Sequence, residues 1–329
     1  MNPTAFVAMC PREERVIVIS LMKSGTHLIQ ELMIALGYRI YGQSRIPSEI
    51  RPVLDADTRL RIMSMVYDKD TLDALKKADD SPFTAAADRA WEALGWAWQL
   101  RFGLPLENRY GIELTNTDLI QQALHRTSSS DFVDTPSGVC WILPELDIKK
   151  IDGRFLREWS RSGKPKIIFN YRDPRDVVLS MVNFLAGKTA QGIGNFSEFQ
   201  VFSRILDSKP SLEAKLTYAL TDRSFPCLND FDRAFWLLQH PDVCKVSFEE
   251  IVGVEGGGST ELQRRAVARI IDFVGADITP ESVMHRLFRR DAFSFFKGQI
   301  GSWRGVFTPD HRRLAAIRFG EMLPLYGYT

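Results

Sequence analysis

Two short segments of this chain combine the residue types that bind phosphate or sulfate groups. In the first, Lys23 to Thr26 (Lys-Ser-Gly-Thr), the lysine supplies a mobile positive charge, Gly25 allows close backbone approach, and two hydroxyls add donors. The segment follows a β-branched run and precedes a helical pattern, so the N–H groups and dipole of the helix N-terminus favour an anion as well. It differs from the Walker P-loop, in which the lysine follows the second glycine. An ordinary turn with a surface lysine is the alternative interpretation.

The second segment, Arg172 to Ser180, follows another apolar run. Arg172 falls at the carboxyl end of that run, and Ser180 lies two turns into the next helical pattern. A guanidinium can hold a phosphate through two parallel hydrogen bonds, and a helix hydroxyl can add a third. The alternative is a salt bridge between Arg172 and Asp176 at the start of the helix. Because open parallel sheets bind ligands at the carboxyl ends of their strands, the two segments predict one ligand with two separated phosphate groups.

Three short apolar runs are typical of strands that are covered on both faces of a parallel sheet. They are Arg15–Ser20, Lys166–Tyr171 and Asp242–Ser247. Helical signals follow them: an apolar stripe over Leu28–Leu36, a capped start at Asp173-Pro174, and a further pattern over Thr260–Val274. This alternation predicts an α/β fold with a central, mainly parallel sheet flanked by helices.

The length of 329 residues fits a single α/β domain that spans residues 1–329. Residues 38–137 and 185–240 are mostly helical in pattern, and we expect them to be insertions that form a cap around an acceptor cavity. The first insertion is rich in tryptophan, at Trp91, Trp96 and Trp98. These side chains are either core residues or part of the cavity wall.

Composition excludes several classes of protein. The chain is 45% hydrophobic and 25% charged, and 42 Lys plus Arg balance 41 Asp plus Glu, so no overall field attracts nucleic acid or an anionic membrane. The four cysteines lie far apart, and neither a signal leader nor a long apolar run is evident. We therefore expect a cytoplasmic, unanchored protein with reduced thiols. No histidine has a partner at metal-ligand spacing, so we expect no metal.

With these segments in this order, the sequence resembles the sulfotransferases that use 3′-phosphoadenosine 5′-phosphosulfate (PAPS). Met22–Leu28 is similar to their 5′-phosphate element, Pro-Lys-Ser-Gly-Thr-Thr-Trp, and Arg172–Ser180 to their 3′-phosphate element. Val246–Ile251 resembles their Tyr-Glu-Asp-Leu segment, and Ser294–Arg304 resembles their late Arg-Lys-Gly-x-x-Gly-x-Trp-Lys loop. The four elements are specific in combination, although each one alone is not.

The resemblance implies a reaction and a set of binding residues. A sulfuryl group would move in line from PAPS to a hydroxyl of a small-molecule acceptor, expected to be a secondary metabolite, and leave adenosine 3′,5′-bisphosphate (PAP). Lys23 would stabilise the charge that develops on the bridging oxygen. The residues implied for the 5′-phosphate are Ser24, Gly25, Thr26 and His27, together with Lys23. Those implied for the 3′-phosphate are Arg172, Ser180, Lys297 and Gly298.

The sequence departs from the family pattern at three positions. His27 replaces a threonine, and Leu28 replaces the tryptophan that stacks on adenine, so another apolar or aromatic side chain must hold the base. Phe296 stands where the late loop usually carries arginine, which weakens the second clamp on the 3′-phosphate.

The general base is predicted to be a carboxylate. Many members carry histidine in a His-Leu-Pro stretch, and Glu145 falls at the corresponding place in this chain. A partly buried carboxylate can accept a proton from an alcohol. Asp147 and His125 are the competing candidates. Glu145 can instead be a helix-start residue or pair with Lys149, four residues further on.

Two other functions fit the same motifs. A nucleotide-dependent small-molecule kinase is one, although the Walker lysine and an acidic Mg²⁺ ligand after a strand are missing. A nucleotide-binding scaffold that has lost its catalytic base is the other. The oligomeric state cannot be predicted from these features.

Overall fold

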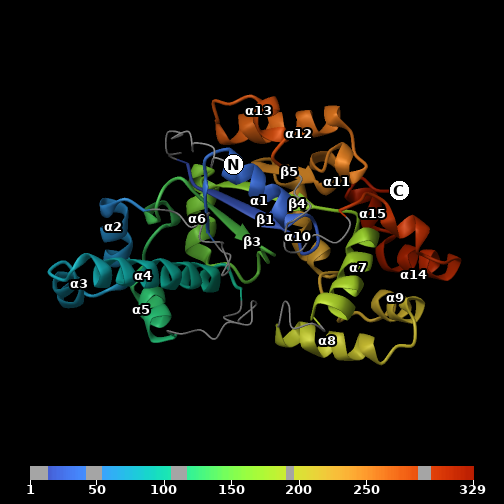
Figure 1. The fold of residues 1–329 in the computed structure, drawn as a ribbon, viewed down its shortest axis with the longest axis horizontal. Coiled ribbons are helices and arrows are strands. Elements are labelled where there is room, and N and C mark those ends of the chain that lie inside the picture. The colour runs from blue at the N-terminus through green and yellow to red at the C-terminus, as the bar shows by residue number, and fades with distance from the viewer. Residues whose placement is uncertain (1–13, 42–53, 105–116, 190–195, 288–297) are drawn as a thin grey trace, which may run out of the picture.

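Five parallel strands form one sheet in this computed structural model, which describes residues 14–41, 54–104, 117–189, 196–287 and 298–329. The strand order is β2-β3-β1-β4-β5 (Figure 1). The strands are β1 (Val16–Ser20), β2 (Arg39–Tyr41), β3 (Val139–Leu143), β4 (Lys166–Tyr171) and β5 (Val243–Ser247). Every neighbouring pair is parallel, which confirms the predicted fold class.

The three predicted strands are β1, β4 and β5, and two further strands were not predicted. β3 is a continuous apolar run between Gly138 and Pro144, so it carries the same signal as the others. β2 is only three residues long and lies inside residues 38–137, a region predicted to be mostly helical. Its short length leaves no pattern that sequence reasoning can use.

Alternate residues of each strand face opposite sides of the sheet, and each side has its own core. Val16 and Val18 of β1 pack in one core with α1 (Thr26–Ala35) and α12 (Thr260–Val274). Ile17 and Ile19 pack in the other core with helices that include α7. All four side chains are fully buried, as expected of a strand covered on both faces.

The helices that follow β1 and β4 cover opposite faces of the sheet. β1 and β4 are paired along their length, yet α1 contributes to one core and α7 (Pro174–Asn183) to the other. Where neighbouring parallel strands send their helices to opposite faces, a crevice opens beyond the carboxyl ends of the strands. A ligand-binding position is therefore expected between the ends of β1 and β4.

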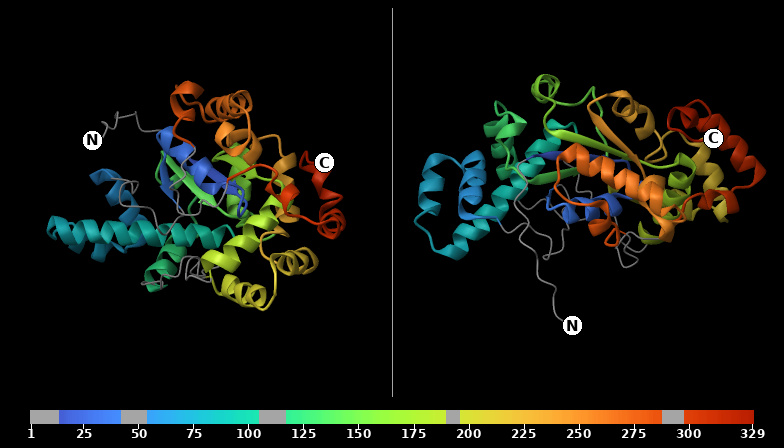
Figure 2. Two further views of the ribbon diagram at one scale, coloured as in Figure 1. Left: turned by 45° about the vertical axis from the view of Figure 1, so that its right-hand side comes forward. Right: turned by 90° about the horizontal axis from the view of Figure 1, so that it is seen from above.

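Two groups of helices stand outside this central layer. The first comprises α2 (Ala56–Val66), α3 (Lys69–Leu75), α4 (Asp80–Arg101), α5 (Thr117–Thr127) and the short 3₁₀ helix η2 (Phe132–Asp134). Both views in Figure 2 show α2 to α5, in blue to blue-green, projecting to one side of the sheet. The second comprises the π-helix η3 (Phe184–Thr189), α8 (Ser197–Asp207), α9 (Leu212–Thr221) and α10 (Asp230–Gln239). Both predicted insertions are largely helical, and their role around an acceptor cavity stays a prediction.

The remaining helices complete the layers around the sheet. They are α6 (Gly153–Ser162), α11 (Phe248–Ile251), η4 (Val254–Gly256), α13 (Pro280–Met284), η5 (Ser302–Gly305), α14 (Pro309–Phe319) and α15 (Met322–Leu325). In the described ranges, no helix is both long and apolar enough to cross a membrane. Three cysteines, Cys140, Cys227 and Cys244, are free and buried, and Cys10 lies outside the described residues.

Tyr41 ties the first helical group to the sheet. Its hydroxyl donates to the backbone carbonyls of Trp91 and Glu92, at 3.1 Å for the latter. A Cβ atom at Gly95 would overlap that hydroxyl, so this position of α4 has no room for a side chain. Trp98 is fully buried and contacts Phe132 edge to face, which identifies it as a core residue.

Candidate functional site

The turn after β1 is fixed by an asparagine from the neighbouring strand. Asn170, near the end of β4, donates from its side-chain amide to the Ser20 hydroxyl and the Ser24 carbonyl, both at 2.9 Å. The hydroxyls of Ser20 and Thr26 lie 2.9 Å apart and share a hydrogen bond. Sequence analysis did not single out Asn170. The signal was a polar residue in an otherwise apolar strand, which needs hydrogen-bond partners when it is buried.

Two residues of this turn have left-handed backbone conformations. Gly25, the N-cap of α1, has a φ of 90°, and a Cβ atom there would lie 2.6 Å from the ring of Phe248. Lys23 has a φ of 65°, a conformation that costs a non-glycine residue about 1–3 kcal/mol. Such strain clusters at functional sites, which makes Lys23 a candidate functional residue.

The Lys23 ammonium is half-buried and lies 4.0 Å from the centre of the Phe184 ring. The pKa of Lys23 is lowered to about 8, mainly by burial, and the nearby positive charge of Arg172 acts in the same direction. His27, in the first turn of α1, also has a lowered pKa, because it is partly buried and lies near the Lys23 charge. Its imidazole is therefore neutral at pH 7.

Arg172 brings the two predicted segments together. Its guanidinium donates to the Lys23 carbonyl at 3.4 Å and to the Gln299 carbonyl at 2.7 Å. It also lies 4.2 Å from the centre of the Phe248 ring, the ring that touches Gly25. The turn after β1, the end of β4 and the late loop therefore meet at one buried arginine.

The predicted alternative for Arg172, a salt bridge to Asp176, is present as well. The two side chains approach to 3.5 Å, and the Asp176 carboxylate is almost fully buried. Asp176 also accepts hydrogen bonds from the backbone N–H groups of Gly301, at 2.7 Å, and Trp303, at 3.0 Å. Burial raises the pKa of Asp176, while Arg172 and these N–H groups oppose that rise. Because Arg172 has further donors, the salt bridge does not exclude a role in phosphate binding.

Several buried polar atoms at this place have no hydrogen-bond partner in the part of the chain that the structure describes. They are the Ser24 hydroxyl, the Nε of Arg172 and the side-chain carbonyl of Asn170. The N-terminus of α1 has no side-chain cap either, so its first N–H groups lack the usual side-chain acceptor. A buried donor without a partner costs about 1–3 kcal/mol, and bound anionic groups would give the Ser24 hydroxyl and the Arg172 Nε their missing acceptors. The residue types present therefore fit a nucleotide phosphate.

Of the other residues implied for the 3′-phosphate, the structure describes Ser180 and Gly298. Ser180 lies on α7 and is half-buried. Gly298 has a left-handed φ of 56° and begins the described part of the late loop beside Gln299. Lys297 and Phe296 lie outside the described residues.

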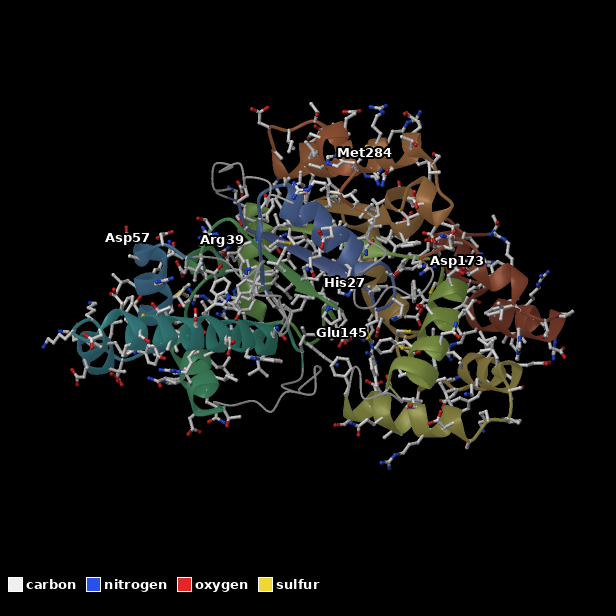
Figure 3. The ribbon with its side chains drawn as sticks, viewed as in Figure 1. His27, Arg39, Asp57, Glu145, Asp173 and Met284 are labelled. Atoms are coloured by element: carbon white, nitrogen blue, oxygen red, sulfur yellow. The ribbon has the colours of Figure 1, made fainter. Side chains whose placement is uncertain are left out.

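Glu145 leaves the same edge of the sheet as Lys23. It follows β3 by two residues, and β3 pairs with β1 in parallel. Figure 3 shows Glu145 and His27 near the middle of the molecule, with Asp173 to their right in this view. The Glu145 side chain is mostly buried and forms an ion pair with Arg233 of α10 at 3.5 Å.

The two competing base candidates have other surroundings. The Asp147 carboxylate accepts a hydrogen bond from the Lys149 backbone N–H at 3.0 Å, so it stabilises the turn after β3. His125 is exposed on α5, which packs against α2 and α4 in the projecting group of helices. Of the three, Glu145 is the one that the structure puts in an ion pair beside the carboxyl edge.

Among the comparisons with known proteins, only the comparison with solved structures found matches. No family model matches the chain, and no curated protein sequence matches it. A crystal structure of retinol dehydratase with androsterone and the inactive cofactor PAP is 17% identical, with a TM-score of 0.43, 95% of this chain covered and 81% of that chain. A mouse sulfotransferase in complex with PAP is 15% identical, with a TM-score of 0.47 and coverages of 94% and 85%. Retinol dehydratase with retinol and PAP is 15% identical, with a TM-score of 0.44 and coverages of 95% and 82%.

The matched structures include a sulfotransferase, the kind of protein that the sequence motifs resemble. At identities of 15–17% and TM-scores below 0.5, this likeness is confined to the overall course of the chain.

Proposed function

We propose that this chain is a sulfotransferase that moves a sulfuryl group from PAPS to a hydroxyl of a small-molecule acceptor. The observation that carries the proposal is the contact between Arg172 and the Lys23 carbonyl at the ends of β1 and β4. This contact joins two segments about 150 residues apart, each with residue types that bind phosphate, at the carboxyl ends of neighbouring strands. A nucleotide with phosphates at both its 5′ and 3′ positions matches that arrangement.

The turn after β1 would hold the 5′ end of the donor. The Ser24 hydroxyl and the first N–H groups of α1, those of Gly25, Thr26 and His27, are the donors for its phosphate. At the other end, Arg172 would bind the 3′-phosphate through Nε, with Ser180, Lys297 and Gly298 as further contacts. The ligand would then lie across the crevice, with its sulfate near Lys23.

The proposed reaction forms one bond and breaks another at sulfur. The acceptor oxygen attacks the sulfur atom, the bond from sulfur to the bridging oxygen breaks, and PAP leaves with the negative charge on that oxygen. The Lys23 ammonium stabilises this charge, and partial burial strengthens the interaction because water screens it less. The residues need only to position the reactants and stabilise charge.

Glu145 is the proposed base that takes the proton of the acceptor hydroxyl. Its position beyond β3 and its mostly buried side chain support this role, with Arg233 orienting the carboxylate. We expect Glu145→Gln to lose turnover while PAP affinity stays within about twofold, since the amide keeps the shape but not the basicity. Glu281→Gln, on the exposed surface of α13, is the control. Near-normal turnover of Glu145→Gln would remove this residue from the mechanism.

The acceptor is proposed to be a partly apolar alcohol, such as a secondary metabolite. Trp91 and Trp96 support this choice, because both are only partly buried in the helical group that includes α4. Incubation with PAPS and a panel of hydroxylated metabolites, with mass spectrometry of the products, would identify it. Donor binding without any sulfated product across a broad panel would instead favour a non-catalytic scaffold.

Isothermal calorimetry tests the nucleotide class directly. We expect tighter binding of PAP than of ATP with Mg²⁺, because Arg172 and the turn after β1 provide two separate anion positions. Preference for ATP with Mg²⁺ would reject the sulfotransferase and favour the kinase.

A further inference from the structure

Asp176 connects the elements that are proposed to bind the 3′ end of the nucleotide. It lies in the first turn of α7, and only 1% of its surface is exposed. One carboxylate oxygen accepts from the Gly301 N–H at 2.7 Å and lies 3.5 Å from Arg172. The other accepts from the Trp303 N–H at 3.0 Å. Both oxygens are therefore used to hold neighbouring parts of the protein.

These contacts fix Arg172 relative to the late loop. The same guanidinium nitrogen that approaches Asp176 donates to the Gln299 carbonyl at 2.7 Å, just ahead of the two N–H groups that Asp176 holds. Arg172 therefore holds the loop at the Gln299 carbonyl, and Asp176 holds it at the N–H groups of Gly301 and Trp303. Charge-assisted hydrogen bonds of this kind are short and directional, so they set orientation as well as position.

The Nε of Arg172 takes no part in this network. Its Nε is buried and has no hydrogen-bond partner among the described residues, whereas its other two nitrogens are engaged. Asp176 itself is unsuited to contact a phosphate, because two negative groups repel each other. A carboxylate beside a phosphate site has to act by orienting the cation and the loop.

We propose that Asp176 is a positioning residue for the 3′-phosphate, acting through Arg172 and the loop of residues 298–303 without touching the nucleotide. This inference rests on the proposed function. It predicts that Asp176 affects recognition of the 3′-phosphate selectively, because the 5′ end is bound by the turn after β1.

Calorimetry with two nucleotides tests the proposal. PAP carries both phosphates, and adenosine 5′-phosphate carries one, so the ratio of their dissociation constants reports the 3′-phosphate alone. We expect Asp176→Asn to weaken PAP binding by about tenfold or more, because one charge-assisted contact network is disrupted, and to leave adenosine 5′-phosphate within about twofold. Circular dichroism confirms that each variant is folded.

Asp173→Asn is the matched control. Asp173 is also buried, caps the same helix, and contacts the same tryptophan, through the Trp303 indole N–H at 3.2 Å. Its carboxylate pairs with Arg175 instead of Arg172. We expect this variant to keep the wild-type ratio of the two dissociation constants, even if its stability falls.

The outcomes separate this inference from the proposed function. Equal affinity of the wild-type protein for both nucleotides would overturn the proposed function, and the role of Asp176 with it. A wild-type preference for PAP that Asp176→Asn retains would overturn the role of Asp176 alone. The same conclusion would follow if Asp173→Asn lost the preference equally, because the effect would then be a general consequence of disturbing α7.

Hydrogen exchange in the wild-type protein provides a measurement that needs no variant. We expect PAP to slow exchange of the Gly301 and Trp303 amides, because a phosphate on Arg172 steadies the loop that Asp176 holds. Adenosine 5′-phosphate at saturation should leave these amides unchanged. Equal slowing by both nucleotides would contradict a role confined to the 3′ end.

Discussion

The two ends of the proposed donor site are built in different ways. At the Arg172 end, Asp176 uses both oxygens and Arg172 uses two nitrogens in contacts with other parts of the protein. At the Lys23 end, the Ser24 hydroxyl has no partner among the described residues, and the lysine lies over the Phe184 ring. At the Arg172 end charged side chains hold one another and the late loop, whereas at the Lys23 end Asn170 holds the backbone and the Ser24 hydroxyl is left for a ligand in the proposed function.

Because of this difference, we expect substitutions at the two ends to affect stability and ligand binding in different ways. Removing a group at the Arg172 end breaks contacts that the folded protein makes in every state, so stability and affinity fall together. Removing a group at the Lys23 end takes away interactions that the ligand alone completes. Affinity or rate then changes while stability does not.

The largest expected effect is on the rate, at Lys23. Lys23→Met should lower kcat by about 100-fold or more, because it removes the charge that stabilises the leaving oxygen. Initial rates of sulfated product formation, with PAPS as donor, provide the measurement. Lys76→Met, at an exposed ion pair with Asp73, should behave like the wild type. A Lys23→Met protein with more than about a tenth of the wild-type rate would contradict this role.

Arg172→Ala should produce the largest loss of stability. The free energy of unfolding should fall by about 3–5 kcal/mol, because the substitution leaves the buried Asp176 carboxylate without its cation. Denaturant titration measures this loss, and PAP affinity should fall in parallel. Arg264→Ala, at an exposed pair with Glu261, should change stability by less than about 0.5 kcal/mol. If Arg172→Ala were equally mild, the contrast between the two ends would disappear.

The pH dependence should reveal the lowered pKa of Lys23. The ammonium is charged below about pH 8 and neutral above it, so kcat/KM should fall roughly tenfold per pH unit beyond that point. If Lys23 had the usual lysine pKa of 10.5, kcat/KM would begin to decline near pH 10.5 instead. Rate profiles at subsaturating PAPS provide the measurement. A profile that stays flat to pH 10 would contradict a required Lys23 charge with a lowered pKa.

Ser24→Ala should have the smallest effect on ligand affinity, and the direction of its effect on Tm is informative. Affinity for adenosine 5′-phosphate should fall about three- to tenfold, while the Tm should stay the same or rise, because a buried hydroxyl without a partner is removed. Ser259→Ala, which removes the N-cap of α12, should do the opposite, with about 1 kcal/mol less stability and unchanged affinity. A lower Tm for Ser24→Ala would show that this hydroxyl already has a structural role.

Sequence reasoning located the residues at both strand ends but not the contacts between them. The apolar runs of β1, β4 and β5 and the Asp173 cap predicted where Lys23 and Arg172 would lie, because local pattern determines those elements. The salt bridge between Arg172 and Asp176 was predicted as an alternative, but the contact of Asp176 with Gly301 joins residues 125 positions apart, and no local pattern encodes it. Asn170 had a signal, a polar residue in a buried strand, whereas its partners Ser20 and Ser24 followed only from the pairing of β1 with β4.

Phe248 contacts both of the segments that are proposed to bind phosphate. One face of its ring supports the guanidinium of Arg172, and its edge rests against Gly25, where no side chain fits. The ring therefore packs between Arg172 and the turn after β1, and it separates the two segments proposed to bind phosphate. A larger side chain at Gly25 would meet this ring, so a change at either residue would have to be matched by a change at the other.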